Sequence, residues 1–149
     1  MRVSKMGPLD RPFIRKLVEA VIASQGLRAE FYWPPDMLTE EMEQSVSWGC
    51  FINDELAAVV LIREMPDVGE ISLLATSPDY RRKGCMEFLL AAIIDAIGHK
   101  REIWLEVHSG NIQAQQLYKK LGFRQDGVRP RYYKDGGSAV LFSRSRTER

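Results

Sequence analysis

The sequence predicts an α/β (α+β) fold, in which a mixed and mostly antiparallel central sheet carries helices on both faces. Two observations lead to this prediction. The middle of the chain indicates consecutive strands joined by short turns, and the last third alternates strand and helix patterns. No repeat, low-complexity block or linker interrupts the 149 residues. We therefore expect one domain over residues 1–143 and a frayed tail over residues 144–149.

The N-terminal third predicts an edge strand and two helices. The strand covers residues 3–6. Asp10 is placed to cap the first helix, and Gly26 to end it. After an aromatic, proline-bearing loop over residues 28–35, a second helix covers residues 35–45. The apolar face of the first helix consists of Ile14, Leu17, Val18, Val21 and Ile22.

The rest of the chain predicts the sheet and two more helices. Residues 48–52 and 56–63 flank a short turn, and the second segment is apolar on both faces, as in a central strand. A turn over residues 66–69 leads into a buried strand over residues 71–76. The remaining elements are a helix over 86–99, a strand over 103–107, a helix from 109–111 to Gly122, and strands over 123–128 and 138–143.

A basic turn with a glycine lies between the strand over residues 71–76 and the helix that follows it. Its residues are Arg81, Arg82, Lys83 and Gly84. Helix N-termini offer unpaired N–H groups and the positive end of the helix dipole, and glycine lets a ligand approach the backbone. The turn is therefore a candidate phosphate site. The alternative is a helix start with solvated arginines, since the glycine patterns of P-loops and dinucleotide sites are absent from the sequence.

Composition narrows the function classes. The net charge is +1, so we expect neither nucleic acid nor a membrane as partner. Cys50 and Cys85 lack metal-ligand spacing and the density of a disulfide scaffold, which predicts free thiols and no metal. The N-terminal residues lack the apolar stretch of a secretory signal, and no apolar run is long enough to span a bilayer. We therefore expect a cytoplasmic protein.

Three side chains are candidates for chemistry. Glu106 lies near the end of its strand, where α/β proteins bind ligands, and could act as a base. The alternative is an exposed glutamate that pairs with an arginine. Tyr118 and Asn111 lie nearly two turns apart on one helix face. Tyr118 is either a proton donor or a core residue, and Asn111 is either a ligand contact or only the N-cap of its helix.

The basic turn resembles the pyrophosphate loop of the GNAT superfamily of N-acetyltransferases, whose usual form is Arg/Gln-x-x-Gly-x-Gly/Ala. Here residues 81–86 are RRKGCM. Three further segments resemble the branch of bacterial ribosomal-protein alanine N-acetyltransferases and protein N-terminal acetyltransferases. They are WLEVHSGN at 104–111, LYKKLGF at 117–123 and RYYKDG at 131–136. The specific resemblance covers about residues 71–139, and the order of elements is similar from end to end.

The resemblance implies acetyl-CoA as co-substrate and assigns roles to residues. Glu106 would be the general base, usually through water, and Tyr118 the general acid for the leaving thiolate. One strand would pair through its backbone with the pantetheine arm, and the basic turn would hold the pyrophosphate. Met86 departs from the final Gly/Ala of the family pattern and Glu87 adds a negative charge, so we expect modest cofactor affinity. The residues implied for cofactor binding are Leu74, Ala75, Thr76, Arg81, Arg82, Lys83, Gly84, Cys85, Met86, Glu87, Asn111 and Tyr118.

We therefore expect an acetyl-CoA-dependent N-acetyltransferase that transfers acetyl directly to an amine. The resemblance favours a protein N-terminal α-amine, such as that of a ribosomal protein. Trp33, in the aromatic segment 31–33, would wall the acceptor groove together with Tyr132 and Tyr133. The alternatives are an acetyltransferase of a small amine, a non-catalytic acyl-CoA-binding module and an interaction domain without a cofactor site. We expect a monomer or a weak homodimer.

Overall fold

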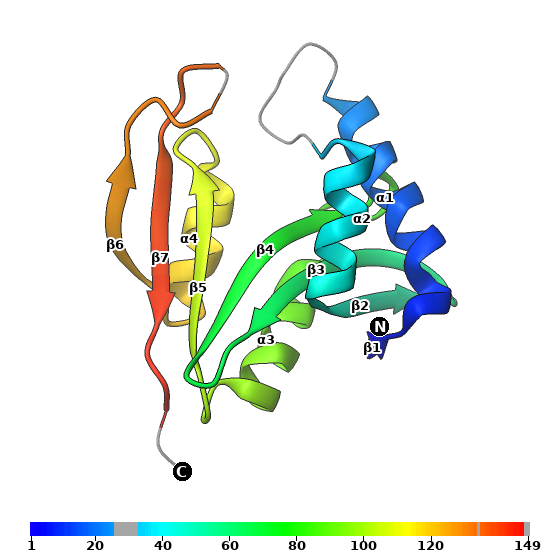
Figure 1. The fold of residues 1–149 in the computed structure, drawn as a ribbon, viewed down its shortest axis with the longest axis horizontal. Coiled ribbons are helices and arrows are strands. Elements are labelled where there is room, and N and C mark those ends of the chain that lie inside the picture. Colours follow the sequence, from blue (N-terminus) through cyan, green and yellow to red (C-terminus); the bar gives the residue numbers. More distant parts are fainter. Residues whose placement is uncertain (26–32, 134, 148–149) are drawn as a thin grey trace.

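The computed structural model describes residues 1–25, 33–133 and 135–147, and in this part of the chain seven strands form one sheet (Figure 1). The strand order is β1-β2-β3-β4-β5-β7-β6. Neighbouring strands pair antiparallel except β4 and β5, which are parallel, so the predicted mixed and mostly antiparallel sheet is confirmed. The strands are β1 (Arg2–Met6), β2 (Val46–Ile52), β3 (Glu55–Glu64), β4 (Val68–Thr76), β5 (Glu102–His108), β6 (Arg124–Arg129) and β7 (Ala139–Arg144).

Helices cover both faces of the sheet, as predicted (Figure 1). The apolar sides of α1 and α2 form one core cluster with β3 and β4. The apolar sides of α3 and α4 belong to a second cluster on the opposite face. The helices are α1 (Arg11–Ser24), α2 (Pro35–Gln44), α3 (Cys85–Ile97) and α4 (Ile112–Lys120), with 3-10 turns at Pro8–Asp10 and Pro78–Tyr80.

The strand β3 is buried on both faces, as its continuous apolar sequence predicts. Val59 and Leu61 pack in the core under α1 and α2, whereas Val60 and Ile62 pack in the core under α3. All four side chains are 0% exposed. Because burial of such a side chain is worth about 1.5–3 kcal/mol, this strand stabilises both layers at once.

A β-bulge interrupts β4. Leu73 is the partner of Leu61 and Ile71 is the partner of Ile62, so Ser72 is an extra residue between two pairs. The bulge turns Ile71 toward the α3 core and Leu73 toward the α1 and α2 core, although the two residues are separated by only one position. Ser72 then faces the same side as Leu73, where it reaches α2.

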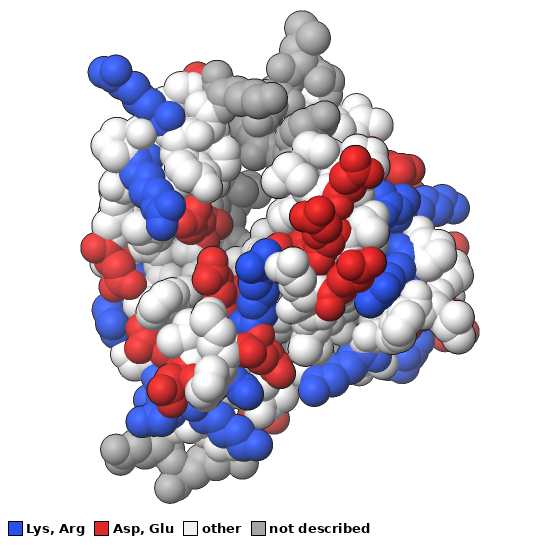
Figure 2. Space-filling view, viewed as in Figure 1, with Lys and Arg blue, Asp and Glu red and all other residues white. Residues whose placement is uncertain are grey.

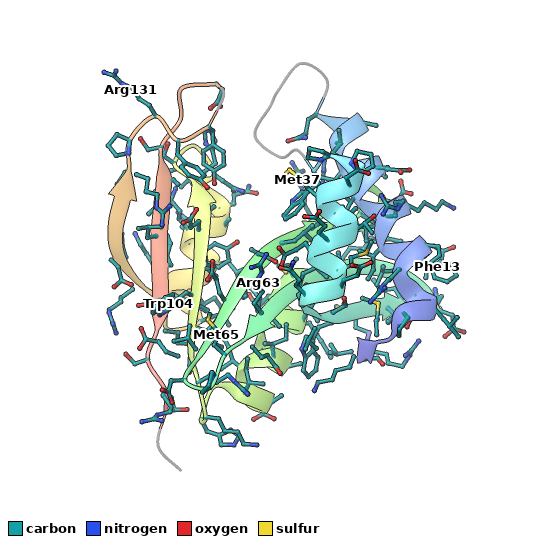
Figure 3. The ribbon with its side chains drawn as sticks, in the orientation of Figure 1. Phe13, Met37, Arg63, Met65, Trp104 and Arg131 are labelled. Carbon is teal, nitrogen blue, oxygen red and sulfur yellow. The ribbon has the colours of Figure 1, made fainter. Side chains whose placement is uncertain are left out.

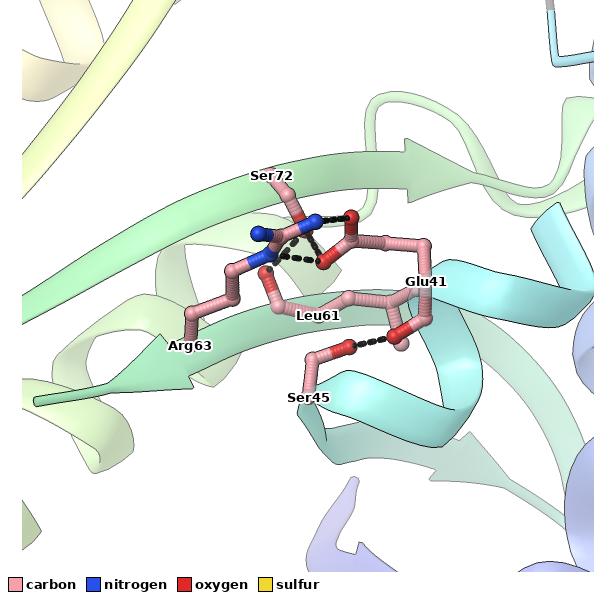
Figure 4. Close-up of polar contacts among 5 residues, drawn as sticks. All are labelled: Glu41, Ser45, Leu61, Arg63 and Ser72. Atoms are coloured by element: carbon pink, nitrogen blue, oxygen red, sulfur yellow. Dashed lines mark hydrogen bonds and ion pairs between the residues drawn. The ribbon is translucent and has the colours of Figure 1, made fainter. Parts of the chain in front are cut away.

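A polar cluster joins α2 to this bulge (Figure 4). Glu41 is only 6% exposed, and its carboxylate accepts bonds from Arg63 Nε at 2.9 Å and Arg63 Nη2 at 2.5 Å. The Ser72 hydroxyl donates to Glu41 Oε2 at 2.9 Å. The Arg63 hydrogen bond holds the pKa of Glu41 below its ordinary value, against the opposing effect of burial. Glu41 therefore fixes α2 to β3 and β4.

We expect Glu41→Gln to lower the free energy of unfolding at pH 7 by about 2 kcal/mol, because Arg63 loses its charged partner. A carboxyl group whose pKa is lowered in the native state stabilises the fold above its unfolded-state pKa. This stabilisation is lost as the pH falls through the native-state pKa. The variant should therefore differ most from wild type above about pH 5 and converge with it in acid. Denaturant unfolding at several pH values measures this, with Glu40→Gln, on the exposed face of α2, as control. Equal losses in both variants would contradict the assignment.

The N-terminal boundaries differ in detail from the sequence prediction. Asp10 does not cap α1 with its side chain. Its carboxylate instead accepts the Gly7 N–H at 2.9 Å, because a separate 3-10 turn precedes the helix. The helix α1 ends at Ser24, and the stop predicted at Gly26 lies outside the described residues.

Two later boundaries also differ. β4 begins at Val68, inside the predicted turn, because Val68 pairs with Glu102 of β5. Arg144, which we expected in a frayed tail, is the last residue of β7. The Thr147 N–H donates to the Gly98 carbonyl oxygen at 2.9 Å. The described chain beyond residue 143 is thus held against the end of α3.

Candidate active site

The site is organised by the separation of β4 and β5. These parallel strands pair only from Val68–Glu102 to Glu70–Trp104, although β4 continues to Thr76 and β5 to His108. Figure 1 shows the two strands diverging beyond this point. The carboxyl-terminal half of β4 therefore pairs with β3 but has no strand partner on its other edge among the described residues. Such an edge offers backbone N–H and C=O groups to an extended ligand.

The predicted cofactor residues of β4 lie on this free edge. Leu74, Ala75 and Thr76 are the last residues of the strand, and all three pair with β3 on the opposite edge. Ala75 is buried in the α1 and α2 core. The groups that these residues offer on the free edge are those of the backbone, so the pairing with a ligand that the resemblance implies stays a prediction.

The basic turn follows directly and exposes its backbone. Arg82 and Gly84 both have left-handed backbones, with φ of 63° and 76°. Gly84 is the N-cap residue of α3, and no side chain caps that helix end within the described chain. A Cβ on Gly84 would meet nothing within 4 Å, so this helix start faces open space. The N–H groups of the first turn are thus available to an anion.

The side chains around the turn leave that backbone accessible. Met86 packs against the α3 core, which explains how the position tolerates a large residue. The Cys85 side chain is buried, and its sulfur lies 3.8 Å from the Tyr80 carbonyl oxygen. Glu87 forms an ion pair with Lys120 at 2.8 Å, so the negative charge that we expected beside the phosphates is balanced. Arg81 donates to the Ser24 hydroxyl at 3.0 Å.

Glu106 projects from the face of β5 opposite to the α3 core. Leu105 and Val107 are buried in that core, whereas the Glu106 side chain is 33% exposed. Its carboxylate lies 3.3 Å from Arg129 of β6. The alternative reading of Glu106, a strand-end glutamate paired with an arginine, therefore describes its contact in the free protein. The Arg129 guanidinium also lies over the ring of Tyr132, 5.7 Å from its centroid.

Tyr118 of α4 occupies the other face of β5. It is 4% exposed and packs beside Phe123 and Phe142, at centroid distances of 6.0 and 5.8 Å. Its hydroxyl makes no hydrogen bond to the described residues. Burial raises the pKa of Tyr118, and the neighbouring Tyr133 raises it further. Tyr118 is therefore a core tyrosine whose phenol stays protonated at neutral pH, and its role as a proton donor stays a prediction.

Tyr133 interacts electrostatically with both candidate catalytic groups, Glu106 and Tyr118. Burial raises its pKa to about 12, and the Glu106 carboxylate is the next cause. Because Tyr133 also acts on the pKa of Tyr118, the three groups share one electrostatic environment. Tyr132 packs edge-on against Tyr133 at 5.2 Å and is 53% exposed. The connection between β6 and β7 thus borders Glu106.

Other predicted site residues lie apart from this group or have a local role. Asn111 caps α4, since its Oδ1 accepts the Ala114 N–H at 3.1 Å. Trp33 is half-buried and packs against the α1 and α2 core. The remaining aromatic residues of its segment, Phe31 and Tyr32, lie outside the described residues.

Sequence reasoning missed three charged or polar residues around Glu106. They are Arg129, His108 and Asp135. His108 is two positions from Glu106 in the same strand and so shares its face, a signal that the sequence did contain. Arg129 and Asp135 come near β5 only because β7 lies between β5 and β6 in the sheet. No local sequence pattern predicts the strand order β5-β7-β6.

No helix in residues 1–25, 33–133 or 135–147 is long and apolar enough to cross a membrane. In the same ranges, no three His, Cys, Asp or Glu residues form a group that could hold a metal ion.

A sheet that opens between two parallel strands, beside an uncapped helix start, defines an α/β protein that can hold an extended anionic ligand at the opening. Comparison with known sequences identifies the class. The chain belongs to the acetyltransferase (GNAT) family, whose model matches residues 16–123. The family prediction from the basic turn and the C-terminal motifs is thereby confirmed.

The chain is also similar to individual proteins of known sequence or structure. Ribosomal protein bS18-alanine N-acetyltransferase of Escherichia coli is 34% identical over 83 residues, which make up 54% of this chain and 56% of that protein. The crystal structure of the ribosomal-protein-S18-alanine N-acetyltransferase from Escherichia coli has a TM-score of 0.86 at 24% identity, covering 99% of this chain and 95% of that chain. A Bacillus subtilis acetyltransferase in complex with CoA has a TM-score of 0.76 at 18% identity, covering 97% of each chain. The chain spans 36% and 56% of the lengths of the first two curated relatives that it matches.

Proposed function

We propose that this protein is an acetyl-CoA-dependent N-acetyltransferase whose acceptor is the α-amine of a protein N-terminus. The observation that carries the proposal is the opening between β4 and β5, with the uncapped start of α3 at its end and with Glu106 and Tyr118 on opposite faces of β5, which borders it. The name of the Escherichia coli relative, an alanine N-acetyltransferase of a ribosomal protein, supports the acceptor class. A cytoplasmic location belongs to the same proposal, since Cys50 and Cys85 are buried free thiols.

Acetyl-CoA supplies an acetyl thioester when bound. The N–H groups at the start of α3 would hold its diphosphate, and the cations of the basic turn would add charge-assisted contacts. The free edge of β4 at Leu74–Thr76 would pair with the extended arm, as a β-strand pairs with a neighbour. The same backbone would orient and polarise the carbonyl of the thioester.

Glu106 would remove the proton from the acceptor ammonium, directly or through water. The freed amine forms a C–N bond to the acetyl carbon, and the C–S bond breaks. Tyr118, kept protonated by burial, would give its proton to the departing thiolate. Two protons leave the nitrogen in all: Glu106 would pass the first to solvent, and the second would leave as the amide forms and would replace, through solvent, the proton that Tyr118 gives to sulfur. Neither cysteine is needed as a nucleophile.

The acceptor would enter from the face that carries Glu106. Tyr132 and Tyr133 would form one wall of its groove, and Trp33, which packs against the α1 and α2 core, would form the opposite wall. Figure 2 shows carboxylates gathered over α2 on this face. The exposed acidic residues of that helix are Asp36, Glu40 and Glu43. A negative surface of this kind attracts a cationic acceptor such as a protonated amine.

A panel of acceptors tests the proposed function. Purified protein and acetyl-CoA are incubated with peptides that begin with alanine or serine, with the same peptides blocked at the N-terminus, and with small amines. We expect acetyl to appear on the α-amine of the free peptides and not on the blocked ones. Transfer only to small amines would contradict the acceptor class. Binding of acetyl-CoA without transfer to any acceptor would instead indicate the non-catalytic module.

Acetyl-CoA should stabilise the folded protein. At a ligand concentration of about 100 Kd, the gain is about 2.7 kcal/mol, or roughly 8 °C in Tm for a domain of this size. Lys83→Glu should weaken binding about tenfold, because it reverses a charge beside the helix start. Lys100→Glu, another exposed lysine but beyond the far end of α3, is the matched control. Equal thermal shifts in the two variants would contradict binding at the basic turn.

A further inference from the structure

His108 uses both ring nitrogens to join separate parts of the chain. Nδ1 accepts the Gly110 N–H at 2.9 Å, and Nε2 lies 2.7 Å from Asp135 Oδ2. Because Nδ1 is an acceptor, the proton of the neutral ring is on Nε2 and is donated to Asp135. The side chain is 12% exposed. His108 is therefore a nearly buried bridge from the end of β5 to the connection between β6 and β7.

Asp135 links His108 to the backbone of the β6–β7 connection. Its Oδ1 accepts the Gly137 N–H at 2.8 Å, while Oδ2 takes the His108 bond. Two backbone bonds close a tight turn around it: the Tyr133 N–H donates to the Gly137 carbonyl oxygen and the Gly136 N–H donates to the Tyr133 carbonyl oxygen, both at 3.0 Å. The Gly137 and His108 bonds also lower the pKa of Asp135. The carboxylate thus ties the turn to β5.

The fit between the imidazole and this turn is close. A Cβ on Gly137 would lie 2.2 Å from His108 Nε2 and 2.4 Å from Cε1, which a rigid ring cannot accommodate. On its other side the imidazole contacts Tyr133, with ring centroids 4.9 Å apart and planes inclined at 33°. His108 therefore fixes both the backbone of the turn and the ring that borders Glu106.

We propose that His108 and Asp135 are positioning residues that hold the β6–β7 connection, and with it Tyr133, against β5 as the acceptor wall beside Glu106. This inference rests on the proposed function for its consequence, the acceptor. These contacts join β5 to the β6–β7 connection and involve no residue of β4 or of the basic turn, so we expect acetyl-CoA binding to be independent of them. Figure 3 shows Arg131 projecting outward from the same connection, on the side away from α2.

The test uses His108→Ala, His108→Gln and Asp135→Asn in the full chain. Glutamine keeps an N–H donor for Asp135, so it should restore much of what alanine loses. Asp126→Asn is the matched control, since Asp126 is a carboxylate of β6 that pairs with Arg124 and does not touch the turn. The readouts are amide hydrogen exchange at Tyr133, Gly136 and Gly137, the affinity of CoA-loaded protein for an alanine-starting peptide, and the thermal shift with acetyl-CoA. The exchange and binding readouts do not need turnover.

We expect His108→Ala and Asp135→Asn to exchange these amides at least about tenfold faster and to bind the peptide about tenfold more weakly, with the acetyl-CoA shift unchanged. His108→Gln should recover most of both effects, and Asp126→Asn should match wild type. Unchanged exchange would overturn the anchoring, and faster exchange with unchanged peptide affinity would overturn the positioning role. A wild-type protein that binds the peptide but acetylates no acceptor would defeat the proposed function alone.

Discussion

Glu106→Gln is expected to lower turnover about 10²- to 10⁴-fold, because the amide keeps the size of the side chain but cannot take a proton. The KM for acetyl-CoA should stay close to wild type, since Glu106 projects toward Arg129 and not toward the start of α3. Steady-state kinetics with a free N-terminal peptide measures both quantities.

The pH dependence of this variant identifies the role of the carboxylate. An α-amine has an ordinary pKa of about 8, so above about pH 9 most of the acceptor is already neutral and needs no base. The defect of Glu106→Gln should therefore shrink steadily from pH 7 to pH 9. Glu70→Gln, an exposed carboxylate on β4, should behave as wild type. A defect that stays constant with pH would point to binding and not to proton removal, and a rate near wild type would refute the assignment.

Tyr118→Phe is expected to lower turnover about 10- to 10³-fold while leaving the protein as stable as wild type or slightly more stable. The two effects separate because the hydroxyl makes no hydrogen bond to the described residues, so its removal breaks no contact. Phenylalanine keeps the packing against Phe123 and Phe142. Measurement of kcat together with the Tm of the same preparation distinguishes loss of an acid from loss of structure.

The raised pKa of Tyr118 adds a second signature. Burial keeps the phenol protonated well above neutral pH, so ionisation of Tyr118 should produce no loss of wild-type rate up to about pH 10. Tyr80→Phe is a suitable control, because it also removes a phenol but one whose hydroxyl donates to Glu55 of β3. Equal rates in wild type and Tyr118→Phe would exclude the proposed acid, and a fall in both rate and Tm would indicate a structural role only.

Much of the fold could be predicted because each element is locally encoded. The continuous apolar run of β3 identified a strand buried on both faces, and the spacing of Leu89, Leu90 and Ile93 identified α3. The bulge at Ser72 could not be predicted, since it depends on the register between β3 and β4. The prediction that Asp10 caps α1 was wrong, because a 3-10 turn that begins with Pro8 precedes the helix and its Gly7 N–H binds the Asp10 carboxylate.

Some residues of the candidate site could be predicted from the sequence, and others could not. The basic turn, Glu106 and Tyr118 are predicted from motifs along the chain, and the structure places the turn before α3 and the two side chains on opposite faces of β5. Arg129 and Asp135 reach Glu106 and His108 across the sheet, so their proximity comes from the order of β7 and β6. Asn111 illustrates an ambiguity that sequence leaves open, because a cap and a ligand contact use the same side chain.

A crystal structure of the protein with CoA tests the central claim most directly. We expect the diphosphate on the N–H groups of residues 85–87 and the extended arm along the free edge of β4 at Leu74–Thr76, with the sulfur between Glu106 and Tyr118. CoA bound elsewhere, or an opening closed by the protein's own side chains at saturating CoA, would contradict it.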